Sequence, residues 1–152
     1  MRTVIALGAN LGDPSKQISH AVDALRDIMI VSALSALYET EPFDVPDDQP
    51  MYTNAVVIGE CALEPRDLMK ELLAIESQLG RQRTFAKAAR TIDLDLIDYG
   101  GVLMESADLT LPHPRAHLRT FVLEPWFEIE PDGFLPGKGP IRELLAALNG
   151  AA

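Results

Sequence analysis

The stretch Arg90-Thr91-Ile92-Asp93-Leu94-Asp95-Leu96-Ile97 alternates acidic and apolar residues with the period of a β-strand. In a strand, Asp93 and Asp95 share one face, with Cα atoms roughly 6.5–7 Å apart, while the neighbouring leucines face the other way, toward a core. Two carboxylates at this spacing suit hard divalent cations, since Mg²⁺ typically takes one or two carboxylates together with substrate phosphates. An Asp-X-Asp strand taken alone is more often a plain solvent-facing edge.

The residues just before this strand carry the opposite charge. Between Arg26 and Arg66 the chain has no Lys or Arg, whereas the ten residues 81–90 hold four cations and no acid. Such a cationic run is unfavourable by self-repulsion unless an anion or nearby carboxylates offset it. A solvated loop balanced by neighbouring acids is the plainer interpretation of this run. However, the run leads directly into the strand that carries the carboxylate pair, and this combination favours a phosphoryl-transfer site. The four cations are Arg81, Arg83, Lys87 and Arg90.

Outward from this strand, hydrophobic periodicity predicts elements in the order β-α-β-β-α-β. Asp13 can cap and Pro14 can open the first helix, and Gly100-Gly101 is expected to turn the last strand into a short strand at Val102-Leu103-Met104. This order predicts an α+β protein, a ferredoxin-like βαββαβ sandwich: a mostly antiparallel sheet with helices packed on one face, plus C-terminal additions. The expected elements are strands 3–7, 30–38, 52–61 and 92–99, helices 14–25, 65–80, 120–129 and 141–148, and a proline-rich loop over 39–51.

Composition narrows the class of protein. The 152 residues suit a single domain, 1–152, and 47% hydrophobic with 24% charged residues is ordinary globular usage. Thirteen Lys and Arg against 23 Asp and Glu give a net charge of −10, so we expect no nucleic-acid or membrane partner. A lone Cys61 and a first apolar run too short for a signal peptide or membrane span point to the cytoplasm. No long unpaired apolar stripe demands a partner, so we expect a monomer.

Seven segments, in chain order, carry a resemblance to a known family. They are Leu7–Asp13, Tyr38-Glu39-Thr40, Tyr52-Thr53-Asn54-Ala55, Ile75-Glu76 with Gly80–Arg83, Arg90–Ile97, Leu111–Arg115 and Arg119–Pro125. From Val4 to about Pro131 the chain resembles the 6-hydroxymethyl-7,8-dihydropterin pyrophosphokinases, and residues 131–152 match only loosely. The resemblance implies transfer of diphosphate from ATP, as co-substrate, to the pterin hydroxymethyl group in folate biosynthesis, with release of AMP and use of two Mg²⁺ ions.

The resemblance also implies roles for individual residues. Asp93 and Asp95 would ligate the metal ions and, with the phosphate clamps Arg81, Arg83 and Arg90, form the catalytic set. The ATP site would comprise Glu76, Arg83, Lys87, Arg90, Leu96, Thr110, His113 and Arg119. The pterin site would comprise Gly8, Asn10, Thr40, Phe43, Tyr52, Asn54 and Phe121, with the two aromatic rings of Tyr52 and Phe121 on either side of the flat heterocycle. Without the resemblance, those rings would be read as core aromatics and Glu76 as a solvated helix residue.

The chain departs from the family pattern in two loops. It has Ala86-Lys87-Ala88-Ala89 where the family usually has a basic residue, an aromatic residue and Gly-Pro, and Thr40-Glu41-Pro42 where Thr-Pro-Pro is common. Two alternatives to a pyrophosphokinase therefore stay open. One is a divergent pterin- or nucleotide-binding relative that acts on another substrate or does not catalyse. The other is a non-enzymatic ferredoxin-like module whose aspartates and arginines are structural.

Overall fold

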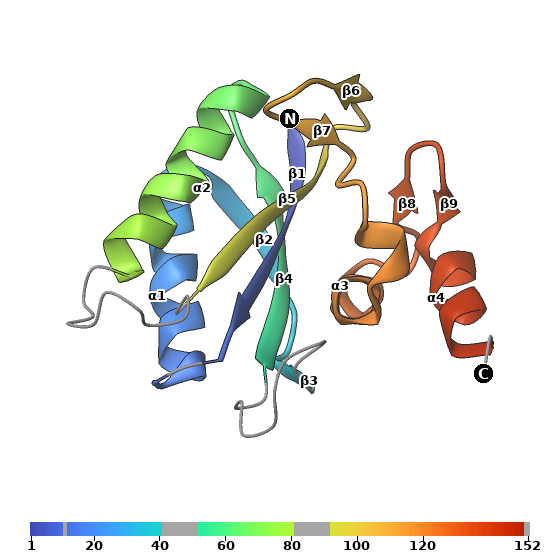
Figure 1. The fold of residues 1–152 in the computed structure, drawn as a ribbon, viewed down its shortest axis with the longest axis horizontal. Coiled ribbons are helices and arrows are strands. Elements are labelled where there is room, and N and C mark those ends of the chain that lie inside the picture. The colour runs from blue at the N-terminus through green and yellow to red at the C-terminus, as the bar shows by residue number, and fades with distance from the viewer. Residues whose placement is uncertain (11, 41–51, 81–91, 151–152) are drawn as a thin grey trace.

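An antiparallel sheet forms the centre of the molecule (Figure 1). The structure is a computed structural model that describes residues 1–10, 12–40, 52–80 and 92–150. Within these residues the sheet has five strands in the order β2-β4-β1-β5, and β3 pairs with β4 beyond the end of β2. This order confirms the predicted ferredoxin-like arrangement. The strands are β1 Arg2–Ala9, β2 Ile30–Leu34, β3 Tyr38–Thr40, β4 Tyr52–Glu60 and β5 Asp93–Tyr99.

Helices lie on both faces of this sheet, whereas the sequence predicted them on one. Helices α1 and α2 cover one face, as expected, and α3 and α4 lie on the opposite side (Figure 1). The helices are α1 Pro14–Arg26, α2 Pro65–Gly80, α3 Thr120–Ile129 and α4 Ile141–Gly150, with a 3₁₀ helix at Ala116–Leu118. None of the helices in the described ranges combines the length and apolar character needed to cross a membrane.

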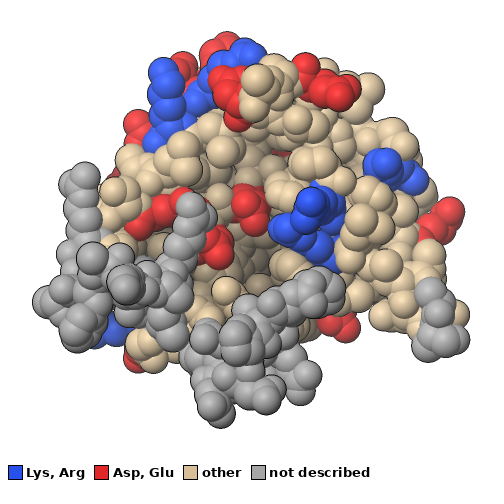
Figure 2. All heavy atoms as spheres, viewed as in Figure 1, with Lys and Arg blue, Asp and Glu red and all other residues tan. Residues whose placement is uncertain are grey.

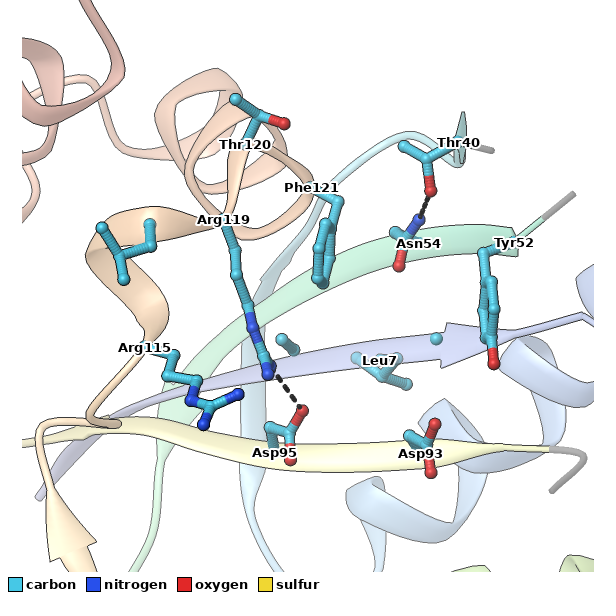
Figure 3. A pocket seen from close by; sticks show the side chains of 13 residues that line it. Leu7, Thr40, Tyr52, Asn54, Asp93, Asp95, Arg115, Arg119, Thr120 and Phe121 are labelled. Atoms are coloured by element: carbon cyan, nitrogen blue, oxygen red, sulfur yellow. Dashed lines mark hydrogen bonds and ion pairs between the residues drawn. The ribbon is translucent and has the colours of Figure 1, made fainter. Parts of the chain in front are cut away.

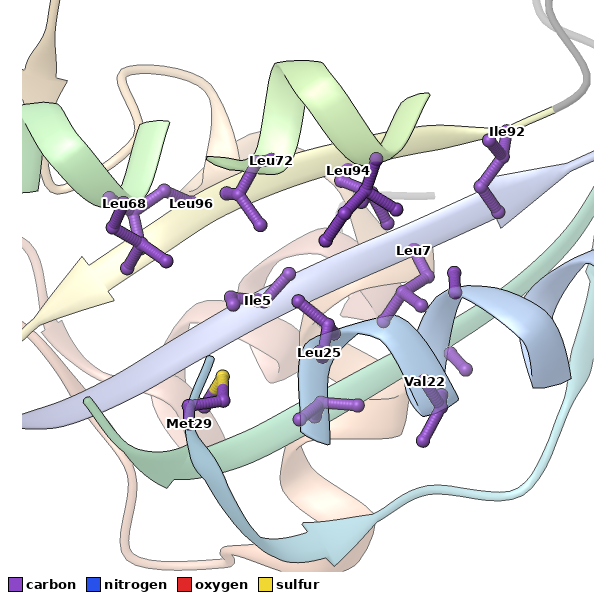
Figure 4. Close-up of a cluster of buried hydrophobic side chains, with 14 of the residues drawn as sticks. Ile5, Leu7, Val22, Leu25, Met29, Leu68, Leu72, Ile92, Leu94 and Leu96 are labelled. Atoms are coloured by element: carbon purple, nitrogen blue, oxygen red, sulfur yellow. The ribbon is translucent and has the colours of Figure 1, made fainter. Parts of the chain in front are cut away.

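The core between the sheet and α1 and α2, called here the α1/α2 core, fixes which way β5 faces. Leu94 and Leu96 are 3% exposed and pack there with Leu68 and Leu72 of α2 (Figure 4). Each buried leucine contributes about 1.5–3 kcal/mol relative to an exposed one. Turning β5 over would therefore expose both leucines, so the acidic residues must occupy the other face, as the alternation predicted.

A separate cluster, called here the α3/α4 core, covers only part of that other face. It holds Val4, Val56 and Ile97 from the strands and Trp126 from α3, all fully buried. Val4 and Ile97 lie toward the end of the sheet where β1 begins and β5 ends, and Val56 lies nearer the middle, opposite Ala6. The opposite end of the same face, where Asp93 pairs with Gly8, is left open for a site.

Local sequence signals account for the start of α1. The Asp13 side chain accepts a hydrogen bond from the Lys16 backbone N–H at 3.2 Å, and Pro14 occupies the first helical position. Both features confirm the predicted cap, because the carboxylate satisfies an N–H that has no partner within the helix.

Two predicted elements differ from the structure. The strand expected over 30–38 divides into β2 and β3, because the Ser35 hydroxyl accepts from the Val56 N–H at 2.9 Å and takes over the pairing at the break. The strand expected at 102–104 as a hairpin partner of β5 is also wrong. Gly100-Gly101 does turn, at positive φ, but the following strand β6, Met104–Glu105, pairs with β7, Thr110–Leu111. Strands β8 Phe134–Leu135 and β9 Gly139–Pro140 form a further pair.

Gly59 provides a test of how closely β2 packs on β4. A methyl group on Gly59 would clash with the backbone carbonyl of Ile30, which cannot move without displacing the strand. We therefore predict that Gly59→Ala lowers the free energy of unfolding by about 1–3 kcal/mol, as overpacking does elsewhere. Urea denaturation measures this, with Gly150→Ala as control because a methyl group there meets nothing within 4 Å. Equal midpoints for Gly59→Ala and the parent would contradict the packing described.

Candidate active site

A cavity of about 860 Å³ lies on the open end of the sheet face that α3 partly covers. Figure 2 shows this hollow, with acidic side chains on one side of it and basic side chains on the other. Strands β1, β3, β4 and β5 supply its floor and one wall, and residues 115–121, which run from the 3₁₀ helix into α3, supply the facing wall (Figure 3). The cavity therefore has a charged end at β5 and an aromatic end near β3 and β4.

The charged end is built on Asp93 and Asp95. Both carboxylates project from β5 into the cavity (Figure 3). Their partners across the ladder on β1 are Gly8 and Ala6, which have little or no side chain. Because nothing bulky stands beside them on the floor, the carboxylates stay accessible, and both are partly exposed.

Glu76 lies at the outer edge of β5 and holds the strand between the two aspartates. Its Oε2 accepts a hydrogen bond from the Leu94 backbone N–H at 2.7 Å. Because β5 is an edge strand, this N–H points away from β1 and has no ladder partner there. A charge-assisted bond at this point fixes the backbone that carries the carboxylate pair.

Cations face the aspartates from the opposite wall. Arg119 Nη1 lies 3.7 Å from Asp95 Oδ2, and its guanidinium carbon lies 5.5 Å from the centre of the Phe121 ring. Arg115 also lines the cavity and points toward the same region (Figure 3). No role for Arg115 was predicted from the sequence. Its position directly after the His113-Pro114 pair of a family segment was the available signal.

The aromatic end presents flat rings and one amide. Tyr52 of β4 and Phe121 of α3 point into the cavity from different walls (Figure 3). The Asn54 Nδ2 donates to Thr40 Oγ1 at 2.8 Å and, more weakly, to the Tyr38 carbonyl at 3.5 Å. Its Oδ1 lies beside Gly8, where a Cβ atom would approach it to 3.2 Å. The amide thus offers an acceptor to a ligand, between apolar rings.

Three further residues that the sequence assigned to a site, Leu96, Thr110 and Asn10, do not line this cavity. Leu96 faces the α1/α2 core, so its side chain points away from the carboxylate pair. Thr110 lies in β7, opposite Glu105. Asn10 is 4% exposed, and its Oδ1 is buried with no hydrogen-bond partner among the described residues. Besides Arg115, the lining residues for which no role was predicted are Ala6, Leu7, Leu118 and Thr120. Phe43, Arg81, Arg83, Lys87 and Arg90, like the departures at Glu41 and 86–89, fall outside the described residues.

The surroundings of His113, beside the charged end, favour its neutral form. Burial is the main cause that lowers its pKa, the nearby Arg119 and Arg115 lower it too, and Asp95 opposes them. Its Nδ1 accepts from the Arg115 backbone N–H at 3.1 Å, so the neutral ring carries its proton on Nε2. The His113 backbone N–H donates to the Ile97 carbonyl at 2.9 Å, which ties this segment to β5.

The donor set at the charged end fits Mg²⁺. Within the described ranges, no three His, Cys, Asp or Glu side chains gather closely enough to hold a metal by themselves. Mg²⁺ does not need such a cage, because it usually binds through one or two carboxylates plus substrate phosphates. Two accessible oxygen-only side chains, with guanidinium groups across the cavity to meet phosphates, match that mode.

A ferredoxin-like sheet that carries a carboxylate pair, facing arginines and an aromatic end defines a small α+β protein built to hold a ligand that is anionic at one end and flat at the other. The chain belongs to the 7,8-dihydro-6-hydroxymethylpterin-pyrophosphokinase (HPPK) family, whose model matches residues 4–131. It is 40% identical over 143 residues to the 2-amino-4-hydroxy-6-hydroxymethyldihydropteridine pyrophosphokinase of Haemophilus influenzae, which covers 93% of this chain and 89% of that protein. The Pseudomonas aeruginosa protein of the same name is 40% identical over 149 residues, covering 96% and 91% of the two chains.

Solved structures show the same fold. A crystal structure of HPPK-DHPS in complex with substrates matches 99% of this chain with a TM-score of 0.77 and 11% sequence identity. The Plasmodium falciparum HPPK-DHPS wild type with pteroate matches 95% of it with a TM-score of 0.72 and 14% identity. This chain spans 43% and 41% of those longer chains, so the likeness covers the part that shares this architecture.

The electrostatics of the charged end can be read from His113. We predict that Asp95→Asn lowers the pKa of His113 further, because it removes a negative charge that favours the imidazolium, and that Arg119→Gln raises it by removing a positive charge. An NMR titration of the imidazole protons in metal-free protein measures both shifts. Shifts of the same sign in the two variants would contradict the arrangement.

Proposed function

We propose that the cavity transfers diphosphate from ATP to the hydroxymethyl group of 6-hydroxymethyl-7,8-dihydropterin, releasing AMP, as a pyrophosphokinase of folate biosynthesis. Membership of the HPPK family supports the reaction class. The observation that carries the proposal is the position of Asp93 and Asp95 on the floor of the same cavity whose other end holds Tyr52, Asn54 and Phe121. The triphosphate needs carboxylates for its metal ions and cations for its oxygens, and the pterin needs flat apolar surfaces and a polar group at its edge. This cavity offers both.

At the aromatic end, the side chains bind and orient the pterin. The rings of Tyr52 and Phe121 contribute apolar, flat surfaces, and each aromatic pair adds about 0.5–1.5 kcal/mol beyond burial. The Asn54 Oδ1 accepts from an N–H of the heterocycle edge, because its Nδ2 is already engaged with Thr40. The hydroxymethyl group then points along the floor toward β5.

At the charged end, the chain holds the triphosphate. Asp93 and Asp95 would hold Mg²⁺, which we propose binds as two ions and supplies charge neutralisation on the phosphates when present. Arg119 and Arg115 lie where they can donate to phosphate oxygens, for which the guanidinium fork is well shaped. Arg119 must exchange its Asp95 contact for phosphate when the nucleotide binds.

Transfer requires the hydroxymethyl oxygen and the β-phosphorus to meet in line. The oxygen forms a bond to the β-phosphorus, the bond from that phosphorus to the α–β bridging oxygen breaks, AMP leaves and the hydroxyl proton is released. Placing both ligands on one floor lowers the entropic part of the barrier, which accounts for much of catalysis in phosphoryl transfer.

We further propose that the chain acts as a monomeric, single-domain cytoplasmic enzyme.

The reaction can be tested by its nucleotide product. Protein mixed with MgATP and 6-hydroxymethyl-7,8-dihydropterin is expected to release AMP, with no ADP, together with the pterin diphosphate, both resolved by chromatography. Binding of pterin and nucleotide without turnover would favour a divergent or non-catalytic relative. Protein that shows neither binding nor turnover would match the non-enzymatic structural module. Either of these two results would refute the proposal.

The carboxylate pair is tested by Asp95→Ala. We predict that this variant folds, because Asp95 is partly exposed, and that its turnover falls about 10²-fold or more, since several kcal/mol of charge stabilisation are lost. Asp132→Ala is the matched control, because Asp132 is an exposed aspartate that pairs with Arg142 outside the cavity. Full activity of Asp95→Ala would exclude the assignment.

A further inference from the structure

Glu128, a residue of α3 outside the cavity lining, joins that helix to the strand beside the site. Its Oε1 accepts a hydrogen bond from the Tyr38 hydroxyl at 2.7 Å and another from the Ala36 backbone N–H at 3.1 Å. Its Oε2 accepts from the same N–H at 3.2 Å. Residues 36 and 38 are thus bound by one carboxylate from a segment 90 residues further along the chain.

The surroundings of the Tyr38 hydroxyl keep it protonated, so that it can donate to Glu128. The hydrogen bond to Glu128, together with burial and the negative charges of Glu128 and Glu124, raises the pKa of Tyr38 to about 12. The hydroxyl therefore remains a donor across the whole range in which an enzyme works, and the bond to a charged acceptor is of the stronger kind.

The two elements that Glu128 joins carry the two walls of the aromatic end. On α3, Phe121 stands seven residues before Glu128, which is two turns, so both lie on the same face of the helix. On the sheet side, Tyr38 pairs directly with Asn54, and Thr40 pairs with Tyr52. The Asn54 amide donates to both Thr40 Oγ1 and the Tyr38 carbonyl, so its orientation depends on where β3 sits.

Strand β3 has few other anchors in the described structure. It is three residues long and pairs along one side, with β4, at the end of the sheet that the α3/α4 core leaves open. Main-chain pairing alone leaves a short edge strand free to shift relative to a helix on the next layer. A side chain that crosses from α3 to β3 removes that freedom.

We propose that Glu128 is a positioning residue for the pterin-binding end of the cavity: by holding Ala36 and Tyr38 to α3, it sets the distance between Phe121 on one wall and Thr40 and Asn54 on the other. This inference rests on the proposed function, since it assigns the aromatic end to the pterin. Glu128 itself reaches neither substrate. Its effect is confined to the wall that recognises the heterocycle and does not extend to Asp93 and Asp95 on β5.

The test compares Glu128→Ala, Glu128→Gln and the parent enzyme. In Glu128→Ala we expect the Kd and KM for the pterin to rise about five- to tenfold, the factor that one or two hydrogen bonds are worth, while the Kd for a non-hydrolysable ATP analogue with Mg²⁺ changes less than about twofold. Glu128→Gln should recover most of the pterin affinity, because the single amide oxygen can accept from both donors that Oε1 now serves. Calorimetric titration of each ligand and steady-state kinetics supply the values.

Two more variants separate positioning from plain stability. Tyr38→Phe keeps the ring and removes the hydroxyl, so it should weaken pterin binding in the same selective way without altering α3. Glu143→Ala, at an exposed glutamate of α4, should leave both affinities unchanged. Glu128 is itself exposed, so its variants are expected to keep the fold, which melting curves check.

The outcomes divide cleanly. Selective loss of pterin affinity in Glu128→Ala and Tyr38→Phe, with recovery in Glu128→Gln, supports the inference. Parent-like pterin affinity in Glu128→Ala, or equal losses for pterin and nucleotide, overturns it while leaving the pyrophosphokinase activity of the parent standing. A parent enzyme that neither binds the pterin nor releases AMP refutes the proposed function, and the inference with it.

Discussion

The alternation of β5 is the constraint on which the site depends. A strand cannot bury Leu94 and Leu96 under α2 without presenting Asp93 and Asp95 on the opposite face. The hydrophobic free energy of the leucines, about 1.5–3 kcal/mol each, therefore holds two carboxylates close together in spite of their mutual repulsion. The Glu76 bond to the Leu94 N–H adds a fixed point at the outer edge of the strand. The charged end of the cavity is in this sense a by-product of core packing, made accessible by the small residues Ala6 and Gly8 on the neighbouring strand.

The cavity exists because the face opposite α1 and α2 is only partly covered. At one end of that face, the α3/α4 core seals the sheet with Trp126 and its neighbours. At the other end, the short segment 115–121 passes over the sheet and supplies both guanidinium groups and the Phe121 ring. If helices covered both faces of the sheet completely, no cavity would remain, and if this face were uncovered, the cavity would have no facing wall. The incomplete third layer gives this HPPK-family chain a floor with walls at both ends.

The sequence predicts the structure correctly where the signal is local or periodic. The βαββαβ order, the Asp13 cap of α1 and the orientation of the aspartates all follow from spacing that the backbone geometry converts directly into direction. The sequence does not predict the structure where a contact joins segments that are distant along the chain. The break between β2 and β3 depends on Ser35 bonding across to Val56, and the Gly100-Gly101 turn leads to a strand that pairs with β7, which no local pattern encodes. For the candidate site, the sequence singled out the residues at both ends of the cavity, but it passed over Arg115, because a lone arginine in a proline-rich segment has no distinguishing spacing.

The segment 115–121 sets the geometry between the two ends of the site. Arg115 and Arg119 face β5, while Phe121 faces β4, so a few consecutive residues fix the separation between the guanidinium groups and the aromatic ring. This segment is held at several levels. The His113 N–H donates to the Ile97 carbonyl on β5. Val122 and Trp126 of α3 are fully buried against the sheet, and Glu128 ties the far turn of α3 to β3. Isolated surface ion pairs contribute about 0–1 kcal/mol, so the Arg119–Asp95 contact cannot supply this rigidity by itself. The packing of α3 against the sheet must do so, which leaves Arg119 free to change its partner without loosening the wall that carries it.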